Sequence, residues 1–414
     1  MNKIELLLPA GNKEKLEYAI RYGADAVYLG VVDFSLRAMR KGELITLDNL
    51  KDSIDLAHQL GKKAYLTLNI FAFNNDIHAL EECMERISDS NPDALIVSDV
   101  GIMRIVRRYM PDTPLHISTQ ANSLNYEAVK FWQDYGATRV ILGREVNIKD
   151  MAEMKSAVPN MELEVFVHGA QCVSFSGRCL ISDYMTNGER KANQGNCCQP
   201  CRWSYKLVEE TRPGQYYEIE QNERGTHIMS TKDLCLVNHL PKLIDAGVDS
   251  LKIEGRTKSL YYVSAVAKTY REAIDAVYKD KNVDLTPYFN ELLKVGNRGY
   301  TTGFYLGDGE YPNDGYSYDI SKGLAGADFL CEIHDKDGDF YKIKTKNKFF
   351  VNTDIEVISP SERFTTQAKE IKNKDGEQLE FANTNDELWV KFDKPINDYK
   401  YAIVRTVGIK VYEN

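Results

Sequence analysis

Short apolar segments alternate with longer amphipathic ones along most of the chain. The apolar segments are predicted strands at residues 4–8, 26–29, 63–68, 94–97, 115–118, 139–142, 163–167 and 250–253. Most of the intervening stretches place apolar side chains at helical spacing, as in residues 13–22, 48–60, 77–88, 126–135 and 149–157. Continuous apolar strands that alternate with helices predict a parallel sheet covered on both faces.

Eight such strand–helix units predict a TIM-like (β/α)8 barrel within an α/β fold. The similar stretches G-A-D-A-V-Y-L-G (23–30) and G-V-D-S-L-K-I-E-G (247–255) support a repeated unit. An open, doubly wound sheet is the alternative. It is less favoured because no Gly-rich dinucleotide loop follows the first predicted strand.

The pattern changes twice along the chain. A long insertion at about 170–245 separates the seventh and eighth predicted strands, within a barrel domain at 1–285. A Gly- and Tyr-rich connector follows at 286–324. Residues 325–414 contain short β-type runs between turn signals and predict a small all-β barrel, read most simply as a stabilising or docking module.

Composition and charge narrow the classes of function. The chain has 414 residues, 43% of them hydrophobic, and no apolar run approaches membrane-spanning length. The N-terminus predicts a buried strand rather than a signal peptide, so a cytoplasmic location is expected. The net charge of −9 argues against charge-driven, sequence-independent nucleic-acid binding but leaves room for a local basic patch.

Cysteines concentrate in the insertion. Five of the eight lie there at positions 172, 179, 197, 198 and 201, and Cys235 follows. Reduced cytosolic thiols favour metal or redox roles over disulfides. The C-x6-C and C-C-x2-C spacings lack the two compact pairs of a zinc ribbon, so an iron–sulfur cluster is favoured over zinc. A reactive cysteine with His168 as its base is the third reading.

Polar residues follow most of the predicted strands. In a (β/α)8 barrel such strand ends meet at one mouth, where active sites lie. Arg144, Lys252 and Arg256 are predicted to form a positive wall for an anionic substrate. The full set of strand-end candidates comprises Asn69, Ser98–Asp99, Ser118–Thr119–Gln120, Arg144, Glu145, His168, Lys252, Glu254 and Arg256.

The longest recognisable motif is E-V-F-V-H-G-A-Q-C-V-S-F-S-G-R-C-L-I-S at 164–182. It resembles the signature of peptidase family U32, the collagenase-like proteases. Others occur in the same order as in the family: P-A-G (9–11), F-S-L-R (34–37), H-I-S-T-Q (116–120), G-N-C-C-Q-P-C-R-W (195–203), S-T-K-D-L-C-L (230–236), L-K-I-E-G-R (251–256) and N-R-G-Y-T-T-G-F (297–304).

The resemblance is strongest to the branch of the family that makes 5-hydroxyuridine at the tRNA wobble position. It implies a [4Fe–4S] cluster, with prephenate as the hydroxyl donor, a tRNA partner and a possible paralogous subunit. Matching the family's motif assigns the cluster to Cys172, Cys179, Cys197 and Cys235, with Cys201 as the substitute third ligand. Because prephenate carries two carboxylates, we hypothesise that Arg144, Lys252 and Arg256 bind them.

Two other functions remain open at this point. The family name implies a peptidase, although the chain contains neither G-x-S-x-G nor H-E-x-x-H. The other is a cluster-bearing accessory protein for a hydroxylase. Basic residues in the insertion (Arg178, Arg190, Lys191 and Arg202) lie near Tyr184 and Trp203, a combination suited to phosphates and unpaired bases.

Overall fold

Eight parallel strands close into a barrel in this computed structural model, which describes residues 3–31, 34–35, 44–172, 174–203, 221–222, 225–226, 231–307 and 326–408. The sheet runs β11-β1-β2-β3-β4-β5-β6-β7, and β11 also pairs with β7. The strands are β1 (Glu5–Pro9), β2 (Ala26–Leu29), β3 (Lys63–Leu68), β4 (Ala94–Val97), β5 (Leu115–Ile117), β6 (Arg139–Ile141), β7 (Glu162–Gly169) and β11 (Ser250–Ile253). The predicted (β/α)8 barrel is confirmed.

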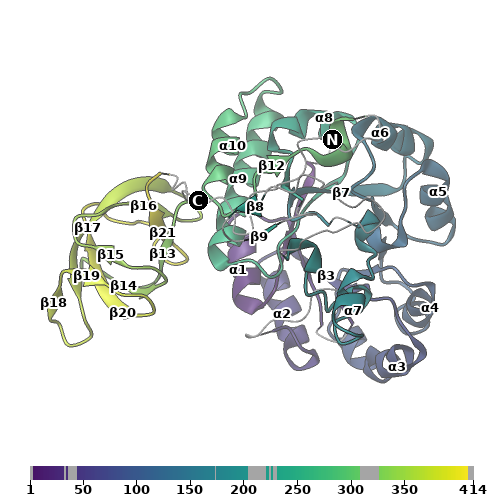
Figure 1. Ribbon diagram of the computed structural model, residues 1–414, viewed down its shortest axis with the longest axis horizontal. Helices are drawn as coiled ribbons and strands as arrows, with labels where there is room; N and C mark the ends of the chain where they lie inside the picture. The colour runs from purple at the N-terminus through teal and green to yellow at the C-terminus, as the bar shows by residue number, and fades with distance from the viewer. Residues whose placement is uncertain are drawn as a thin grey trace, which may run out of the picture.

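Helices surround this barrel on the outside (Figure 1). They are α1 (Lys13–Arg21), α2 (Leu47–Gln59), α3 (Asn74–Asp89), α4 (Val100–Tyr109), α5 (Tyr126–Asp134), α6 (Ile148–Ala157), α8 (Leu240–Asp245) and α9 (Leu260–Lys279). Side chains cap several of them at the mouth. Asp99 accepts hydrogen bonds from the amides of Gly101 and Ile102 at 2.8 and 3.1 Å, which starts α4 directly after β4.

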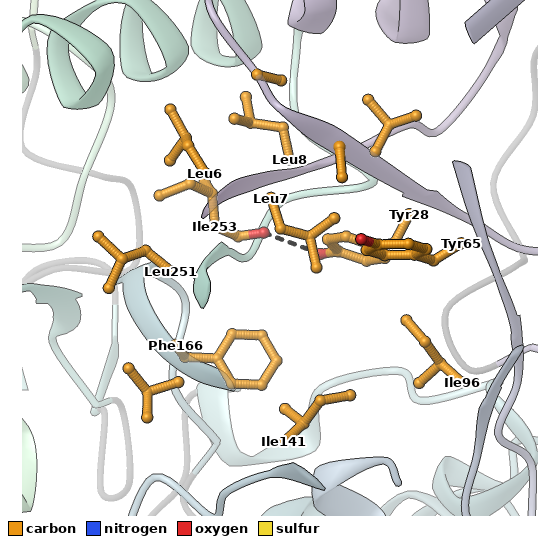
Figure 2. Close-up of a cluster of buried hydrophobic side chains, with 14 of the residues drawn as sticks. Leu6, Leu7, Leu8, Tyr28, Tyr65, Ile96, Ile141, Phe166, Leu251 and Ile253 are labelled. Carbon is orange, nitrogen blue, oxygen red and sulfur yellow. Dashed lines mark hydrogen bonds between the residues drawn. The ribbon is translucent and has the colours of Figure 1, made fainter. Parts of the chain in front are cut away.

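The barrel interior is packed with side chains. Three aromatic side chains lie inside the ring of strands: Tyr28 of β2, Tyr65 of β3 and Phe166 of β7 (Figure 2). The Tyr28 hydroxyl donates to the carbonyl of Ile253 at 3.0 Å, which ties β2 to β11. All three aromatic side chains are buried, so the barrel centre is a core and the open site is confined to its mouth.

The insertion contributes short elements and one additional strand. These are η2 (Phe175–Gly177), α7 (Ile181–Met185), η3 (Ala192–Gln194), η4 (Pro200–Arg202) and β10 (Asp233–Cys235). Strand β10 pairs antiparallel with the end of β7. Most of the polar part of the insertion, residues 209–226, lies outside the described residues; β8 (Gln221–Asn222) and β9 (Gly225–Thr226) are described and pair with each other.

The connector continues the sheet before the second domain begins. After α10 (Thr286–Leu293), β12 (Tyr300–Thr301) pairs with β10, and η6 (Gly303–Leu306) follows. The rest of the predicted connector, from 308 to 324, lies outside the described residues. No helix in the described part of the chain is both long and apolar enough to cross a membrane.

Residues 329–406 form the predicted β domain, which lies beside the barrel near α1, α9 and α10 (Figure 1). Six antiparallel strands close into a ring in the order β16-β21-β13-β14-β20-β17, with β16 pairing back to β17. These strands, together with shorter ones, are β13 (Phe329–Asp337), β14 (Phe340–Thr345), β15 (Phe349–Phe350), β16 (Asp354–Ile358), β17 (Arg363–Lys372), β18 (Gln378–Leu379), β19 (Phe381–Ala382), β20 (Glu387–Phe392) and β21 (Ile403–Thr406).

Candidate active site at the barrel mouth

Arg144 follows β6 and points across the barrel mouth. Its guanidinium carbon lies 3.7 Å from the centre of the Phe166 ring, and its Nη2 lies 3.6 Å from Oε2 of Glu254. Both charged side chains are largely buried, at 13% and 11% exposure. The aromatic ring and the carboxylate therefore hold one guanidinium in place at the mouth.

Arg256 occupies a neighbouring part of the mouth, just after β11. Its Nη1 donates to Ser35 Oγ at 2.7 Å and to Thr67 Oγ1 at 3.2 Å. Both of these partners are hydroxyl groups, and together they orient the guanidinium at the mouth. The hydroxyls of Ser35 and Thr67 also contact each other. The site thus contains a second oriented cation, as an anion-binding mouth requires.

Lys252 lies deeper than the two arginines. Its ammonium is 2.6 Å from Glu164 and 4.4 Å from the centre of the Tyr28 ring, and its side chain is only 5% exposed. Burial lowers the pKa of Lys252 below its usual value, against the opposing charge of Glu164. Glu164 also pairs with Arg139 at 2.9 Å. The positive charge of Lys252 is therefore compensated by Glu164 within a buried ion network.

His168 lies on the outer side of the barrel wall. The pairing of β7 with β11 shifts register between Lys252 and Ile253, so that Ile253 is opposite His168. The His168 ring contacts the rings of Tyr262, Tyr270 and Tyr300 at centroid distances of 5.9, 5.5 and 5.3 Å. Burial lowers the pKa of His168 to about 3, so this imidazole is neutral at physiological pH.

Two aromatic residues that the sequence analysis did not single out support the mouth. Phe166 lies under Arg144, and its own carbonyl accepts a hydrogen bond of 2.7 Å from the Tyr305 hydroxyl of η6. The charges of Arg144 and Glu145 both act on the pKa of Tyr305, which burial raises. Alternation along β7 places Phe166 on the same face as Glu164, whereas no local pattern identifies Tyr305.

Other polar side chains at the strand ends form hydrogen bonds with backbone amides or with one another. Asp99 caps α4, as described above, and Ser118 Oγ accepts from the Gln120 amide at 3.3 Å. Asn69 Nδ2 reaches Ser118 Oγ at 3.5 Å. These contacts explain why polar residues occupy these positions without assigning them a part in chemistry.

Three of the predicted cluster cysteines lie in the insertion, and the charges of two of them act on the third. Desolvation, together with the charges of the Cys172, Cys179 and Cys198 thiolates, raises the pKa of the Cys197 thiol. Each of the three predicted ligands accepts a backbone N–H from the residue two positions later: Cys172 from Ser174 at 3.4 Å, Cys179 from Ile181 at 3.4 Å and Cys197 from Gln199 at 3.3 Å. Such donors stabilise a thiolate and the sulfur of an iron–sulfur ligand.

Cys235 has different surroundings. It accepts a backbone N–H from Val237, but it is buried opposite His168 in the β7–β10 pairing, with its sulfur 3.9 Å from the Tyr270 hydroxyl. Burial raises the pKa of Cys235 to about 12. Cys198 and Cys201, by contrast, belong to the same segment as Cys197 and are partly exposed. The assignment of Cys235 to a cluster remains a prediction.

Thiolates are the usual ligands of a [4Fe–4S] cluster, and Cys172, Cys179 and Cys197 each offer a thiol with a backbone N–H donor. Within the described residues, no three Cys, His, Asp or Glu side chains form a group that could hold one metal ion. The cluster and its ligand set remain predictions.

The insertion lies against the mouth loops. The Phe71 amide donates to the Asn193 carbonyl at 3.1 Å, and Arg178 Nη2 donates to the Gln120 carbonyl at 2.6 Å. The Arg178 guanidinium also lies 5.4 Å from the centre of the Phe71 ring. Large apolar side chains are exposed in and around the insertion, namely Phe73, Phe175, Leu180, Tyr184 and Trp203, with Tyr184 82% exposed.

Comparison with known proteins covers both parts of the chain. Residues 11–314 match the model of peptidase family U32, and residues 326–405 match the model of the peptidase family U32 C-terminal domain. Similar proteins include tRNA hydroxylation protein P of Escherichia coli and tRNA hydroxylation protein P1 of Bacillus subtilis. Each is 38% identical over 92% of this chain, which covers 92% and 89% of those proteins respectively. The 23S rRNA 5-hydroxycytidine C2501 synthase of Escherichia coli is 35% identical over 68% of this chain and 40% of its own length.

Proposed function

The chain belongs to peptidase family U32, and from that premise we propose that it hydroxylates the wobble uridine of tRNA to 5-hydroxyuridine. The names of its relatives support an RNA hydroxylase. Two that match over nearly their full length are named for tRNA hydroxylation, and a third is named for hydroxylation of an rRNA cytidine. The family name alone supports a peptidase.

The pair of oriented arginines at the mouth is the observation that carries the proposed substrate chemistry. Arg144 is held on Phe166 and Arg256 on two hydroxyls, so two guanidinium groups face one mouth from different strands. Prephenate carries two carboxylates, and guanidinium groups bind carboxylates with charge-assisted hydrogen bonds. Arg144 and Arg256 therefore bind the donor, while Lys252 keeps the Glu164 charge balanced below them.

The proposed reaction replaces the C5–H bond of the uracil ring with C5–OH. The uridine carbon loses two electrons, and the donor carbon gains them as its hydroxyl is exchanged for hydrogen. A bound [4Fe–4S] cluster would supply the redox chemistry for this exchange. Cys172, Cys179 and Cys197 would hold it, with their amide donors from Ser174, Ile181 and Gln199 stabilising the thiolates, and a fourth thiol would complete the set.

The exposed aromatic rim of the insertion supports RNA as the second substrate. A wobble base is unpaired, so an aromatic side chain can stack on it once it leaves the anticodon stack. Tyr184 and Phe175 present such faces beside Arg178, which is anchored to the mouth through Gln120. The rim would thereby guide the base toward Arg144 and Arg256.

The geometry around His168 gives no support to a thiol or serine peptidase. A general base must be neutral and within hydrogen-bond reach of its nucleophile. His168 is neutral, but its ring is enclosed by Tyr262, Tyr270 and Tyr300 on the outer side of the barrel. An accessory protein for a separate hydroxylase would share the cysteines but has no need of two oriented arginines at the mouth.

Isothermal titration calorimetry tests whether the arginines at the mouth bind prephenate. Replacing Arg256 by Ala removes a charge-assisted partner of the carboxylate, and we expect affinity to fall by about tenfold or more. Arg86→Ala is the matched control, because Arg86 lies on α3 and pairs with Asp48 at an exposed site. Equal affinities of Arg256→Ala and wild type for prephenate would count against the proposal.

A further inference from the structure

Lysines recur at every second position along and just beyond β14 of the β domain. The segment Y-K-I-K-T-K-N-K-F-F (341–350) places them at 342, 344, 346 and 348. Within the strand, Tyr341 and Ile343 are buried while Lys344 is exposed, so Lys342 and Lys344 lie on the outer face; Lys348, beyond the strand, is also exposed. Two of the four have carboxylate partners: Lys342 pairs with Glu387 at 3.4 Å, and Lys346 pairs with Glu332 at 3.0 Å.

An exposed aromatic pair follows the lysines. Phe350 in β15 is 52% exposed and lies opposite Phe381 of β19, with ring centroids 5.7 Å apart. The Lys348 ammonium lies 3.9 Å from the centre of the Phe381 ring and 4.9 Å from that of Phe350. Within the part of the chain that the structure describes, no carboxylate is in ion-pair contact with Lys344 or Lys348.

Lys344 and Lys346 are the part of this edge whose charges act on the barrel. They oppose the rise in the pKa of Glu14, in the first turn of α1, that burial and the charge of Glu332 cause. The start of α1 is itself at the mouth: a Cβ at Gly11 would come within 2.2 Å of the Arg256 carbonyl oxygen.

The position of the β domain relative to the barrel is fixed by buried contacts. The hydroxyl oxygen of Tyr22, the residue directly after α1, lies 2.8 Å from the carbonyl oxygens of both Ile358 and Tyr401 and donates its one hydrogen between them. Ile358 and Ile403 pack within the same hydrophobic core as the barrel. An RNA that reaches the mouth would thus meet the lysine edge at a constant position.

We propose that the basic–aromatic edge formed by Lys344, Lys346, Lys348, Phe350 and Phe381 binds the substrate RNA outside its anticodon loop. The lysines contact phosphates, and the exposed Phe350 ring stacks on an unpaired base. The identity of the RNA as tRNA rests on the proposed function. In a chain with a net charge of −9, a local cationic edge also orients an anionic polymer toward one side of the molecule.

Binding of two RNAs to the full-length protein tests this surface. Full-length tRNA can reach both the mouth and the edge, whereas an isolated anticodon stem–loop is expected to reach the mouth alone. For Lys344→Gln/Lys348→Gln we expect affinity for full-length tRNA to fall about tenfold and the salt-dependence slope to decrease by about two. For Phe350→Ala we expect a loss of about fivefold. Affinity for the stem–loop should not change in either variant.

The matched control is Lys336→Gln/Lys374→Gln, which removes the same charge elsewhere on the β domain. Unchanged binding of full-length tRNA to the edge variants, or an equal loss in the control, would overturn the proposal, as would wild-type protein that binds no RNA. Nucleoside analysis of the same samples separates the two claims. Edge-dependent tRNA binding without 5-hydroxyuridine would refute the reaction alone, and hydroxylation with edge-independent binding would refute the surface alone.

Discussion

At the scale of single residues, the barrel keeps its buried charges in contact with opposite charges. Glu5, Arg139, Glu164 and Lys252 form a continuous network from the bottom of the barrel toward its mouth. Removing one member of such a pair would leave a buried charge without compensation, which costs about 3–5 kcal/mol. This network is why Lys252 acts as a structural partner beneath the two arginines rather than as an open cation at the mouth.

Of this network the sequence singles out only Lys252, and it predicts neither Glu5, Arg139 and Glu164 as partners nor their pairing. Alternation along β7 and β11 places Glu164 and Lys252 inside the barrel. Their contact depends on the register between β7 and β11, in which Phe166 is opposite Lys252. The same register shift turns His168 outward, and a shift of one residue leaves no mark in composition or spacing.

The iron content of single Cys→Ser variants tests which cysteines bind the proposed cluster. Cys179→Ser should reduce iron bound after anaerobic purification to well below that of wild type, because Cys179 lies among the gathered thiols and accepts the Ile181 amide. Cys235→Ser tests the prediction from the family motif. Retained iron in that variant would remove Cys235 from the ligand set, and lost iron would place it there.

Cys83→Ser is the control for general effects of losing a thiol, since Cys83 lies in α3 and packs against the barrel core. Colorimetric iron and sulfide assays with an absorption spectrum provide the measurement. Iron that stays at the wild-type level in Cys179→Ser would contradict the proposed cluster.

At the scale of elements, β7 connects the core, the mouth and the insertion. Its first half pairs with β6 and β11 inside the barrel, and its last residues pair with β10. The strand prediction at 163–167 differs from the observed Glu162–Gly169 because this additional pairing extends the strand. The pairing of β7 with β10 joins residues more than 60 positions apart, and local periodicity cannot reveal it.

Tyr305 links the connector to this strand. Its hydroxyl donates to the Phe166 carbonyl, and the Phe166 ring supports Arg144. In Tyr305→Phe the buried carbonyl loses its partner, so we expect the free energy of unfolding to fall by about 1–2 kcal/mol. Because the support of Arg144 loosens, the KM for prephenate should rise more than kcat falls.

Tyr109→Phe, at an exposed position on α4, is the control for the loss of a hydroxyl group. Urea unfolding and initial-rate kinetics provide the two measurements. A decrease in kcat with an unchanged KM would show that Tyr305 does not act through the arginine.

At the scale of the whole molecule, the contact between barrel and β domain is built around Arg405. This fully buried side chain from β21 contacts Glu291 of α10, Glu356 of β16 and the Tyr261 hydroxyl of α9. Burial raises the pKa of Glu291, but the charges of Arg405 and Arg363 outweigh it, so the pKa lies below its ordinary value of 4.5. The sequence predicts two domains from the change in pattern, but it does not predict this contact, because Arg405 sits in a β-type run without a local partner.

Arg405→Ala should lower the free energy of unfolding by about 3–5 kcal/mol, because it leaves Glu291 and Glu356 without their main cation. A carboxyl with a depressed pKa contributes stability above its unfolded pKa and loses that contribution as pH falls through the folded pKa. Without Arg405 the pKa of Glu291 rises. Acid unfolding of Arg405→Ala should then begin at a higher pH than in wild type.

Lys369→Ala, on β17 of the same domain, is the control for this comparison. Circular dichroism during urea and acid titrations measures both effects. Identical acid transitions for Arg405→Ala and wild type would show that the contact does not stabilise the two domains together.

The central claim is that this chain hydroxylates a wobble uridine with prephenate as the donor. The most direct measurement is mass spectrometry of nucleosides from unmodified tRNA after incubation with anaerobically purified protein and prephenate. We expect 5-hydroxyuridine to form at the wobble position only when prephenate is present, and not to form with Arg256→Ala. Absence of 5-hydroxyuridine, with iron bound and tRNA binding intact, would contradict it.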